Sequence, residues 1–266
     1  MPELVFLKLG GSLITDKTRP YTPRLDKLAD LAGQIASALS ADPGLRLLVG
    51  HGSGSFGHTA AQQYGTRQGV RDARGWRGFS EVADRARELN DFVMHALHMA
   101  GIPSMSFPPS AAAIASNGQV TLWESTPIRM ALANKILPVV YGDVAFDEVR
   151  GGTILSTEDL FAHLARTLLP QRILLAGLEE GVWADFPART RRVEEITPAS
   201  FREIQAGVGK AAGADVTGGM ESKVKQMLDL VDQLPGMTAE IFSGETAGSV
   251  ARALGGTQMG TLVRGD

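Results

Sequence analysis

Short apolar runs alternate with longer amphipathic stretches along the whole chain. Several runs are apolar at consecutive positions, which is typical of strands that are buried on both faces of a parallel sheet. The runs that have the length of a strand are LVFLKLG from Leu4, RLLVG from Arg46, SMSF from Ser104, ILPVVYG from Ile136, RILLAG from Arg172, AEIFSG from Ala239 and GTLVRG from Gly260. We therefore expect each of these runs to form a strand.

The stretches between the runs carry apolar residues at helical spacing. This spacing predicts a helix from Ser80 to Ala100, with Ser80 as its N-cap and Gly101 as its stop. Further helices are expected at about 24–41, 157–169, 219–233 and 246–254. The alternation predicts an α/β fold in which helices cover both faces of a mostly parallel central sheet. Ligands would bind beyond the carboxyl ends of its strands.

A chain of 266 residues fits one domain with two lobes. A soft boundary between the lobes falls near Pro170. Residues 145–154 have the pattern of a β-hairpin. Residues 183–197 are polar, and we expect them to form a surface excursion outside the sheet.

The composition narrows the classes of partner. A formal net charge of −3 gives no electrostatic reason to expect nucleic acid or an anionic membrane as a partner. No apolar run approaches the roughly 18 residues of a membrane span, and the N-terminus lacks the pattern of a signal peptide. The chain has no cysteine, which excludes disulfides, thiolate metal sites and a cysteine nucleophile. A cytoplasmic location agrees with that absence.

Glycines gather in three segments where a strand gives way to another element. The segments are KLGGSLITDK (residues 8–17), GHGSGSFGH (50–58) and DVTGGMESK (215–223). Glycine lets the backbone approach a ligand closely, and successive N–H groups near a helix start attract anions. Any one segment could be a simple tight turn, but each of the three has a lysine or histidine nearby. Together they predict a phosphate-binding site.

The familiar nucleotide motifs do not fit these segments. GHGSGSFGH is not followed by Lys-Ser or Lys-Thr, so a Walker A loop is absent. No GxGxxG with an acidic residue on the next strand fits a dinucleotide site either. A different phosphate-handling fold is needed.

The segments together resemble the amino-acid kinase superfamily, and within it the isopentenyl phosphate kinases. The resemblance extends over nearly the full length, and includes YGD at 141–143, STED at 156–159 and TGGMESK at 217–223. It implies a three-layer αβα sandwich, with acceptor phosphate bound by an N-terminal lobe (1–169) and nucleotide by a C-terminal lobe (170–266). It also implies ATP and Mg²⁺ as cofactors, isopentenyl phosphate as the acceptor and isopentenyl diphosphate as the product.

The resemblance implies roles for individual residues as well. Lys8 would contact the phosphoryl group in transit, Lys17 would stabilise the transition state, and Asp159 would orient the lysines. No residue is assigned as a metal ligand. The residues expected around the ATP phosphates are Lys8, Gly10, Gly11, Ser12, Gly54, Gly219 and Lys223.

The acceptor phosphate would lie against Ser53, His58 and Gly142. Within the superfamily, the histidine that ends GSGSFGH separates kinases of phosphate acceptors from kinases of carboxylates. An imidazole with a pKa of about 6.5 can be protonated beside a phosphate dianion and donate a charge-assisted hydrogen bond. We therefore expect His58 to bind the acceptor as imidazolium.

Several of these residues also have simpler interpretations. Lys17 could be a solvated loop lysine. Asp159 could cap a helix. His51, which comes before the glycine loop, is more easily explained by hydrogen bonds to the backbone than by a role in catalysis.

The chain departs from the pattern of its relatives at GLEEGVW (177–183), where many of them have an Asp-rich turn that holds the base and ribose. Glu180 could accept a ribose hydroxyl there, or the segment could be a surface turn. For the acceptor tail, the helix at 80–100 together with Phe107 and Ile114 could line an apolar pocket.

Three rival functions stay open at this point. A fosfomycin kinase also needs a cation for a phosphonate, so the tail pocket would decide between the two. A glutamate or acetylglutamate kinase would leave His58 without a dianionic partner. A nucleotide-binding sensor or storage protein would have no use for Lys8, Lys17 and Lys223 together. A homodimer is the expected assembly.

Overall fold

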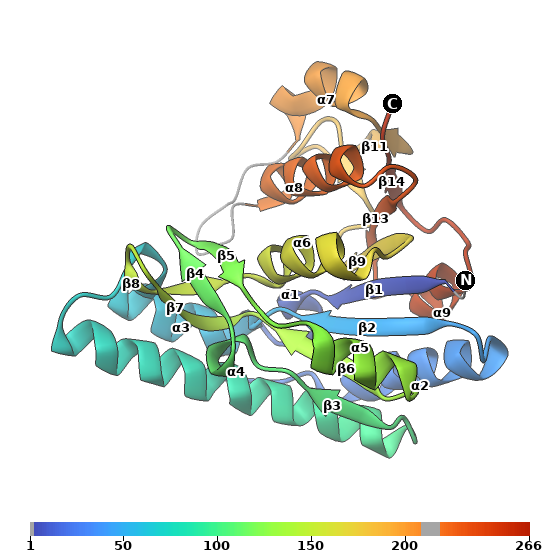
Figure 1. Ribbon diagram of the computed structural model, residues 1–266. Coiled ribbons are helices and arrows are strands. Elements are labelled where there is room, and N and C mark those ends of the chain that lie inside the picture. The colour runs from blue at the N-terminus through green and yellow to red at the C-terminus, as the bar shows by residue number, and fades with distance from the viewer. Residues whose placement is uncertain (1–2, 209–218) are drawn as a thin grey trace.

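The structure is a computed structural model and describes residues 3–208 and 219–266. Within that range, helices cover both faces of a central eight-stranded sheet (Figure 1). In spatial order its strands are β12 (Glu195–Ile196), β14 (Thr261–Val263), β13 (Thr238–Ser243), β9 (Arg172–Gly177), β1 (Leu4–Leu9), β2 (Arg46–His51), β6 (Leu137–Tyr141) and β3 (Ser104–Ser106). Neighbouring strands are parallel except β13 and β14.

Two groups of helices form the outer layers. On one face lie α5 (Thr126–Ala133), α6 (Thr157–Leu168) and α8 (Gly219–Gln233). On the other lie α1 (Gly11–Ile14), α2 (Leu25–Ala41), α4 (Ala73–Met99) and α9 (Ser249–Leu254). The αβα sandwich expected from the sequence is therefore confirmed. No helix in the described part of the chain is long and apolar enough to span a membrane.

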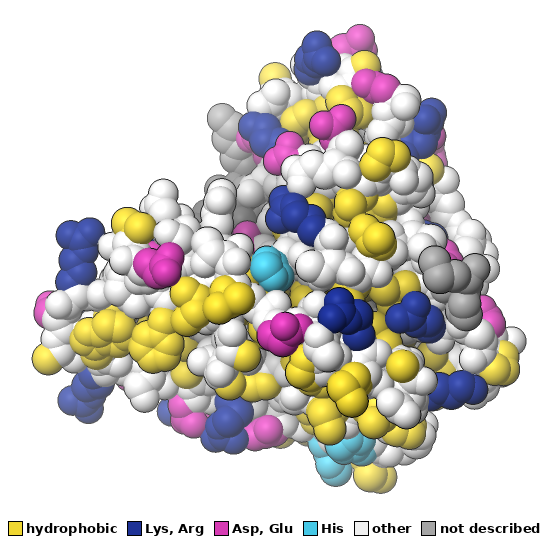
Figure 2. Space-filling model, viewed as in Figure 1, with side chains coloured by type: hydrophobic (Ala, Val, Ile, Leu, Met, Phe, Trp, Pro, Cys, Tyr) yellow, Lys and Arg dark blue, Asp and Glu magenta, His cyan; other side chains and the backbone are white. Residues whose placement is uncertain are grey.

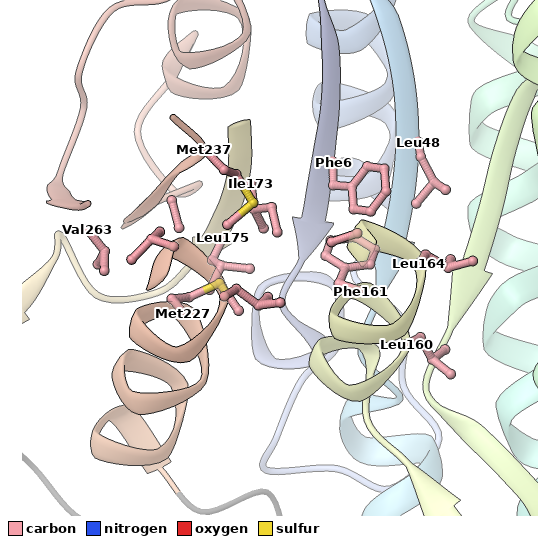
Figure 3. Close-up of a cluster of buried hydrophobic side chains, with 14 of the residues drawn as sticks. Phe6, Leu48, Leu160, Phe161, Leu164, Ile173, Leu175, Met227, Met237 and Val263 are labelled. Atoms are coloured by element: carbon pink, nitrogen blue, oxygen red, sulfur yellow. The ribbon is translucent and has the colours of Figure 1, made fainter. Parts of the chain in front are cut away.

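Side chains that alternate along β1 form both halves of the core. Phe6 packs on Phe161 of α6, with ring centroids 5.1 Å apart, and Figure 3 shows this pair beside Leu48. Val5 and Leu7 belong to the cluster on the opposite face. This alternation is what a strand covered on both faces requires.

A smaller sheet lies beside the main one, with the order β5 (Gln119–Leu122), β4 (Ile114–Ser116), β7 (Asp143–Asp147) and β8 (Gly151–Leu155). The antiparallel pair β7 and β8 confirms the hairpin predicted at 145–154. Next to it lie α3 (Gly54–Tyr64) and η1 (Thr66–Gln68), a short 3₁₀ helix. The other elements are η2 (Pro109–Ala111), β10 (Val182–Trp183), β11 (Arg192–Val193), α7 (Pro198–Ile204) and η3 (Gln205–Gly207).

An apolar patch is exposed where β7 meets the N-terminal part of α4. The rings of Trp76, Phe79 and Phe146 contact one another there, with centroids 5.2–5.9 Å apart. Trp76 is 39 % exposed and Phe146 is 51 % exposed. Figure 2 shows hydrophobic side chains gathered on this part of the surface.

All seven apolar runs form strands of the main sheet, and the helices expected at about 24–41, 157–169, 219–233 and 246–254 are present. Two predictions were wrong. Helix α4 begins at Ala73, with Asp72 as the N-cap that accepts a hydrogen bond from the N–H of Gly75, and not at Ser80. Part of the stretch at 183–197 also joins the main sheet, as β12 beside β14.

The carboxyl ends of four parallel strands meet at one edge of the sheet. Gly10, Gly52 and Gly142 directly follow β1, β2 and β6, and Gly177 ends β9. Each of the first three donates its N–H to a backbone carbonyl near the end of the neighbouring strand, at 2.8–3.0 Å. This edge therefore has a floor of glycine backbone that side chains do not cover.

Gly50 permits the close approach of α6 to this edge. A Cβ at Gly50 would lie 2.5 Å from Cγ2 of Thr157 and 2.6 Å from Cε1 of Phe161. We predict that Gly50→Ala lowers the free energy of unfolding by about 1–3 kcal/mol, because buried residues have no room to shift. Urea unfolding followed by circular dichroism measures the change.

Gly33 is the matched control, because it lies exposed in α2 and a Cβ there would meet nothing within 4 Å. Gly33→Ala should stabilise the protein by about 0.5–1 kcal/mol, since alanine has the higher helix propensity. Equal stability of Gly50→Ala and the unmodified protein would contradict the packing described for α6.

Candidate active site

A cavity of about 310 Å³ opens above the glycine floor. It brings together residues that lie far apart in the sequence and that were expected at the phosphate site. They are Lys8, Gly10, Gly11, Ser12, Lys17, Ser53, Gly54, Gly142, Gly219 and Lys223. Residues 215–218 of the third glycine segment lie outside the described residues.

The first two glycine loops pack backbone against backbone. A Cβ on Gly11 would lie 2.7 Å from Cα of Gly54, and one on Gly52 would lie 2.8 Å from the N of Gly11. Gly54 also has a positive φ of 49°, which side chains rarely adopt. The glycines of the opening motifs are thus needed for the loops to touch, in addition to any contact with a ligand.

Four helices of the described part of the chain begin at the cavity. Their first residues, which all line it, are Gly11 of α1, Gly54 of α3, Thr157 of α6 and Gly219 of α8. Unpaired N–H groups and the helix dipole give such ends a partial positive charge. Their convergence favours a ligand with several negative charges.

Lys8 and Glu158 form a buried ion pair at the centre of the site. Nζ of Lys8 contacts Oε1 of Glu158, and the two residues are 8 % and 3 % exposed. Burial lowers the pKa of Lys8, and the charge of Glu158 opposes part of that effect. Burial alone would raise the pKa of Glu158, but the charges of Lys8 and Lys223 outweigh it and hold this pKa below its ordinary value. The two opposite charges thus offset part of the cost that burial imposes on each of them.

Lys17 is exposed and lies in a loop whose base is fixed. The N–H of Asp16 donates to the carbonyl of Thr22 at 2.9 Å, and the N–H of Ser55 donates to Oγ1 of Thr15 at 3.0 Å. These bonds tie the loop to itself and to α3. The ammonium of Lys17 is thereby held at the rim of the cavity without being buried.

Asp159 caps α6 and does not line the cavity. Its Oδ2 accepts hydrogen bonds from the N–H and Oγ of Ser156, at 2.8 and 2.7 Å, and its Oδ1 accepts one from Gln226 at 3.1 Å. The carboxylate that contacts Lys8 is that of Glu158, one residue earlier. The geometry therefore favours the capping interpretation of Asp159. It is Glu158 that lies in a position to orient Lys8.

The two histidines of the glycine motif differ in what the structure describes. His51 is fully buried and stacks on Tyr141, and its ring nitrogens lie 3.2 Å from the carbonyl of Gly52 and 3.2 Å from Oδ1 of Asn90. Burial lowers its pKa to about 4, so it stays neutral at pH 7 and serves the packing of the loop. His58 lies in α3, and its side chain lies outside the described part of the structure.

One end of the cavity is apolar. Ala61 of α3, Val82 and Ala86 of α4, and Ile154 of β8 line it. Phe107 and Ile114, which we expected at this pocket, do not. The predicted helix, α4, does contribute side chains to the pocket, but β8 contributes the residue that completes it, Ile154.

The other end is formed by the C-terminal lobe. Glu179 lines it and accepts hydrogen bonds from Nε1 of Trp183 at 3.0 Å and from Arg189 at 2.8 Å. The guanidinium of Arg189 lies over the ring of Phe186, 5.3 Å from its centroid. Glu180, considered for a ribose contact, is exposed and does not line the cavity. The planar groups at this end suit a nucleotide base.

Residues 3–243 match the description "Amino acid kinase family". The chain belongs to the amino acid kinase family. It is 31 % identical to the isopentenyl phosphate kinase of Methanothermobacter thermautotrophicus, over 98 % of this chain and 99 % of the relative. It is 35 % identical to the isopentenyl phosphate kinase of Haloferax volcanii, over 99 % of this chain and 100 % of the relative.

Solved structures of the amino acid kinase family agree with this assignment. A set described as X-ray structures of isopentenyl phosphate kinase superposes with a TM-score of 0.81 and 30 % identity, over 98 % of this chain and 99 % of the other. An N-acetylglutamate synthase from Neisseria gonorrhoeae shares the fold, with a TM-score of 0.67 at 15 % identity, over all of this chain and 60 % of the other. The chain is a phosphotransferase of this family, and the cavity lies where its glycine motifs converge.

Sequence analysis missed Glu158, although a signal for it was present. Phe161 and Ala165 are buried, and Glu158 lies on their face of α6, three and seven residues away. Asp159 lies about 100° further round the helix. Helical periodicity extended backwards from the apolar residues would therefore have selected Glu158.

We predict that Glu158→Gln lowers kcat by a factor of about 10²–10³, because Lys8 loses the carboxylate that keeps it charged and in place. Removing one member of a buried pair also costs stability, roughly 3–5 kcal/mol when the other charge is left unpaired. Steady-state rates and melting temperatures, measured on the same samples, separate the two effects.

Asp159→Asn is the comparison variant. It removes a helix-capping carboxylate, so we expect a loss of about 1 kcal/mol of stability and a smaller effect on kcat than in Glu158→Gln. A larger loss of kcat in Asp159→Asn would return the orienting role to Asp159.

Two buried aspartates of β7 should respond to pH in opposite ways. Burial raises the pKa of Asp143 to about 6, although hydrogen bonds from Ser110 and Val144 oppose the shift. Burial would also raise the pKa of Asp147, but four backbone N–H donors outweigh it and lower that pKa. Asp143 therefore favours folding when it is protonated, and Asp147 favours folding when it is ionised.

We predict that Asp143→Asn stabilises the protein at pH 7–8 by up to roughly 3 kcal/mol, because it removes the cost of ionising a buried carboxyl. The gain should shrink as the pH falls below about 6 and vanish below 3.8, where the carboxyl is protonated in both the folded and the unfolded state. Asp147→Asn should destabilise, with a loss that is largest above about pH 4. Melting temperatures between pH 4 and 8 test both, and parallel pH profiles would contradict the assignment.

Proposed function

We propose that this chain transfers the γ-phosphoryl group of ATP to isopentenyl phosphate and releases ADP and isopentenyl diphosphate. The observation that carries the proposal is that one cavity joins a cationic, glycine-lined phosphate site to a small apolar pocket. The curated relatives of that name, at 29–35 % identity over at least 98 % of this chain, support the choice of acceptor.

The acceptor tail lies in the apolar pocket formed by Ala61, Val82, Ala86 and Ile154. Small side chains from two helices leave room there for a short branched hydrocarbon. The phosphate of the acceptor then points towards Ser53 and Gly142. His58 is proposed to bind this phosphate as imidazolium, and its position in the first turns of α3 supports that role.

The nucleotide lies along the C-terminal lobe, with its phosphates at Gly10, Gly11, Gly219 and Lys223. In the proposed division, 1–169 is the acceptor-binding lobe and 170–266 the nucleotide-binding lobe, and Gly10 and Gly11 of the first lobe complete the site of the nucleotide phosphates. The base lies among the planar groups around Glu179.

In the reaction, an oxygen of the acceptor phosphate attacks the γ-phosphorus as the bond from that phosphorus to the β,γ-bridging oxygen breaks, and ADP leaves with the bond's electron pair. The second pKa of a phosphate monoester is about 6, so the nucleophile is ionised at pH 7 and no general base is needed. The transition state spreads negative charge over the transferred oxygens. Lys8, Lys17 and Lys223 stabilise that charge, and Glu158 holds Lys8 in place.

Mg²⁺ is proposed to arrive with ATP. The part of the chain that the structure describes contains no group of three or more histidine or acidic side chains that could hold a metal ion. Mg²⁺ is commonly bound through nucleotide phosphates and water with few protein ligands. When bound, it would neutralise charge on the β- and γ-phosphates.

A homodimer and a cytoplasmic location stay predictions. The exposed patch of Trp76 and Phe146 supports an interface on this side of the molecule, because large apolar groups favour contact with another surface. Sedimentation of the purified protein would test the dimer.

The test of function is the release of ADP with Mg-ATP and, in parallel, isopentenyl phosphate, dimethylallyl phosphate, fosfomycin and glutamate. We expect turnover with the two isoprenoid phosphates, and a loss of at least about tenfold in kcat/KM for them in His58→Ala. His163→Ala, on the outer part of α6, is the histidine control and should leave the rates unchanged.

Turnover confined to fosfomycin or to glutamate would replace the acceptor and keep the phosphate site. ATP binding without ADP release for any acceptor would favour the sensor interpretation. Full activity of His58→Ala on isopentenyl phosphate would remove His58 from the acceptor site.

A further inference from the structure

Arg67 is a further positively charged residue that lines the cavity, in addition to Lys8, Lys17 and Lys223. It lies in η1 between α3 and α4, and its side chain lines the cavity and is 29 % exposed. Its carbonyl oxygen accepts hydrogen bonds from Nη1 of Arg150 and Oγ1 of Thr153, both at 3.3 Å. The backbone that carries the guanidinium is therefore fastened to β8.

The guanidinium of Arg67 has N–H groups that make no hydrogen bond to the described residues. Its Nη1 is buried from solvent and has no hydrogen-bond partner in the part of the chain that the structure describes. Its Nη2 lies 3.9 Å from Oδ2 of Asp159, beyond hydrogen-bond distance. That oxygen already accepts two hydrogen bonds from Ser156. Solvent does not reach Nη1, so a ligand in the cavity would meet the part of the guanidinium that is exposed and lines it.

The position of Arg67 selects which ligand group it meets. The apolar end of the cavity is built from α3, α4 and β8, and η1 connects the first two and packs on the third. The nucleotide end is built from the C-terminal lobe instead. A group on η1 therefore lies on the acceptor's side of the cavity.

We infer that Arg67 binds the phosphate group of the acceptor through its guanidinium, an inference that rests on the proposed function. A guanidinium presents parallel N–H donors that match two phosphate oxygens. It thus offsets the repulsion between the acceptor phosphate and the ATP phosphates, at the face of the acceptor that the lysines of the nucleotide site do not cover.

The test is the kinetics of Arg67→Met and Arg67→Lys with isopentenyl phosphate varied at saturating Mg-ATP, and with Mg-ATP varied at saturating acceptor. We expect Arg67→Met to raise the KM for isopentenyl phosphate by about 10–100-fold and the KM for ATP by less than about twofold. Arg67→Lys should recover only part of the loss, because an ammonium is a point charge without the planar fork.

Arg166→Met is the matched control. Arg166 is an exposed arginine of α6 that donates to Gln233 at 2.9 Å and does not line the cavity, so its loss should leave both KM values unchanged. Melting temperatures of all variants show whether they are folded. If Arg67→Met does not fold, Arg67→Lys carries the test.

The outcomes separate the inference from the proposed function. An unchanged KM for isopentenyl phosphate in a folded Arg67 variant, or an equal rise in both KM values, would overturn the inference alone. If the unmodified protein does not turn over isopentenyl phosphate, the proposed function fails first. Calorimetric titration of inorganic phosphate in the presence of Mg-ADP then decides about Arg67, since a tenfold weaker binding in Arg67→Met supports it and equal binding overturns it.

Discussion

The buried ion pair of Lys8 and Glu158 is the constraint on which the rest of the site depends. Lys8 lies in the central strand of the sheet, where its neighbours Leu7 and Leu9 are fully buried. A lysine is tolerated there only if an opposite charge reaches it. Glu158 supplies that charge from the first turn of α6, so α6 must begin at this point above the sheet.

Several features of the chain serve this placement of α6. Ser156 and Asp159 form a capping box that defines its first residue. Gly50, directly opposite Lys8 on the next strand, leaves the space that Thr157 and Phe161 occupy. The N-terminus of the helix then faces the same cavity as the ion pair, so the element that holds Lys8 also contributes its own dipole to phosphate binding.

Much of the fold could be predicted from the sequence, because strands buried on both faces leave continuous apolar runs that hardly occur otherwise. The start of α4 could not, because ARGWRG has the composition of a loop. Its Gly78 is there for packing, since a Cβ would lie 2.7 Å from Cδ1 of Tyr64 on the neighbouring helix. The strand β12 is only two residues long and is defined by its partner β14, which no local pattern reveals.

The glycines and lysines of the site could be predicted from the sequence, but Glu158 and Arg67 were not. Glycine loops with lysines close by follow from the chemistry of phosphate, which needs backbone donors and positive charge whatever the acceptor. Arg67 has no such signature, because a lone arginine after a helix is most often a surface residue. The role inferred for Arg67 depends on two tertiary contacts. Thr153 of β8 holds its carbonyl, and the carboxylate of Asp159 near its guanidinium accepts hydrogen bonds from Ser156.

A phosphate acceptor needs no general base, which agrees with a site built from backbone groups and cations. An acceptor that brings its own ionised oxygen leaves the protein only the tasks of positioning and of neutralising charge. His51 illustrates this, because burial keeps it neutral and its ring packs on Tyr141 behind the glycine loop. The contribution of each cation then depends on its distance from the transferred oxygens, and the backbone at the strand ends fixes where those cations lie.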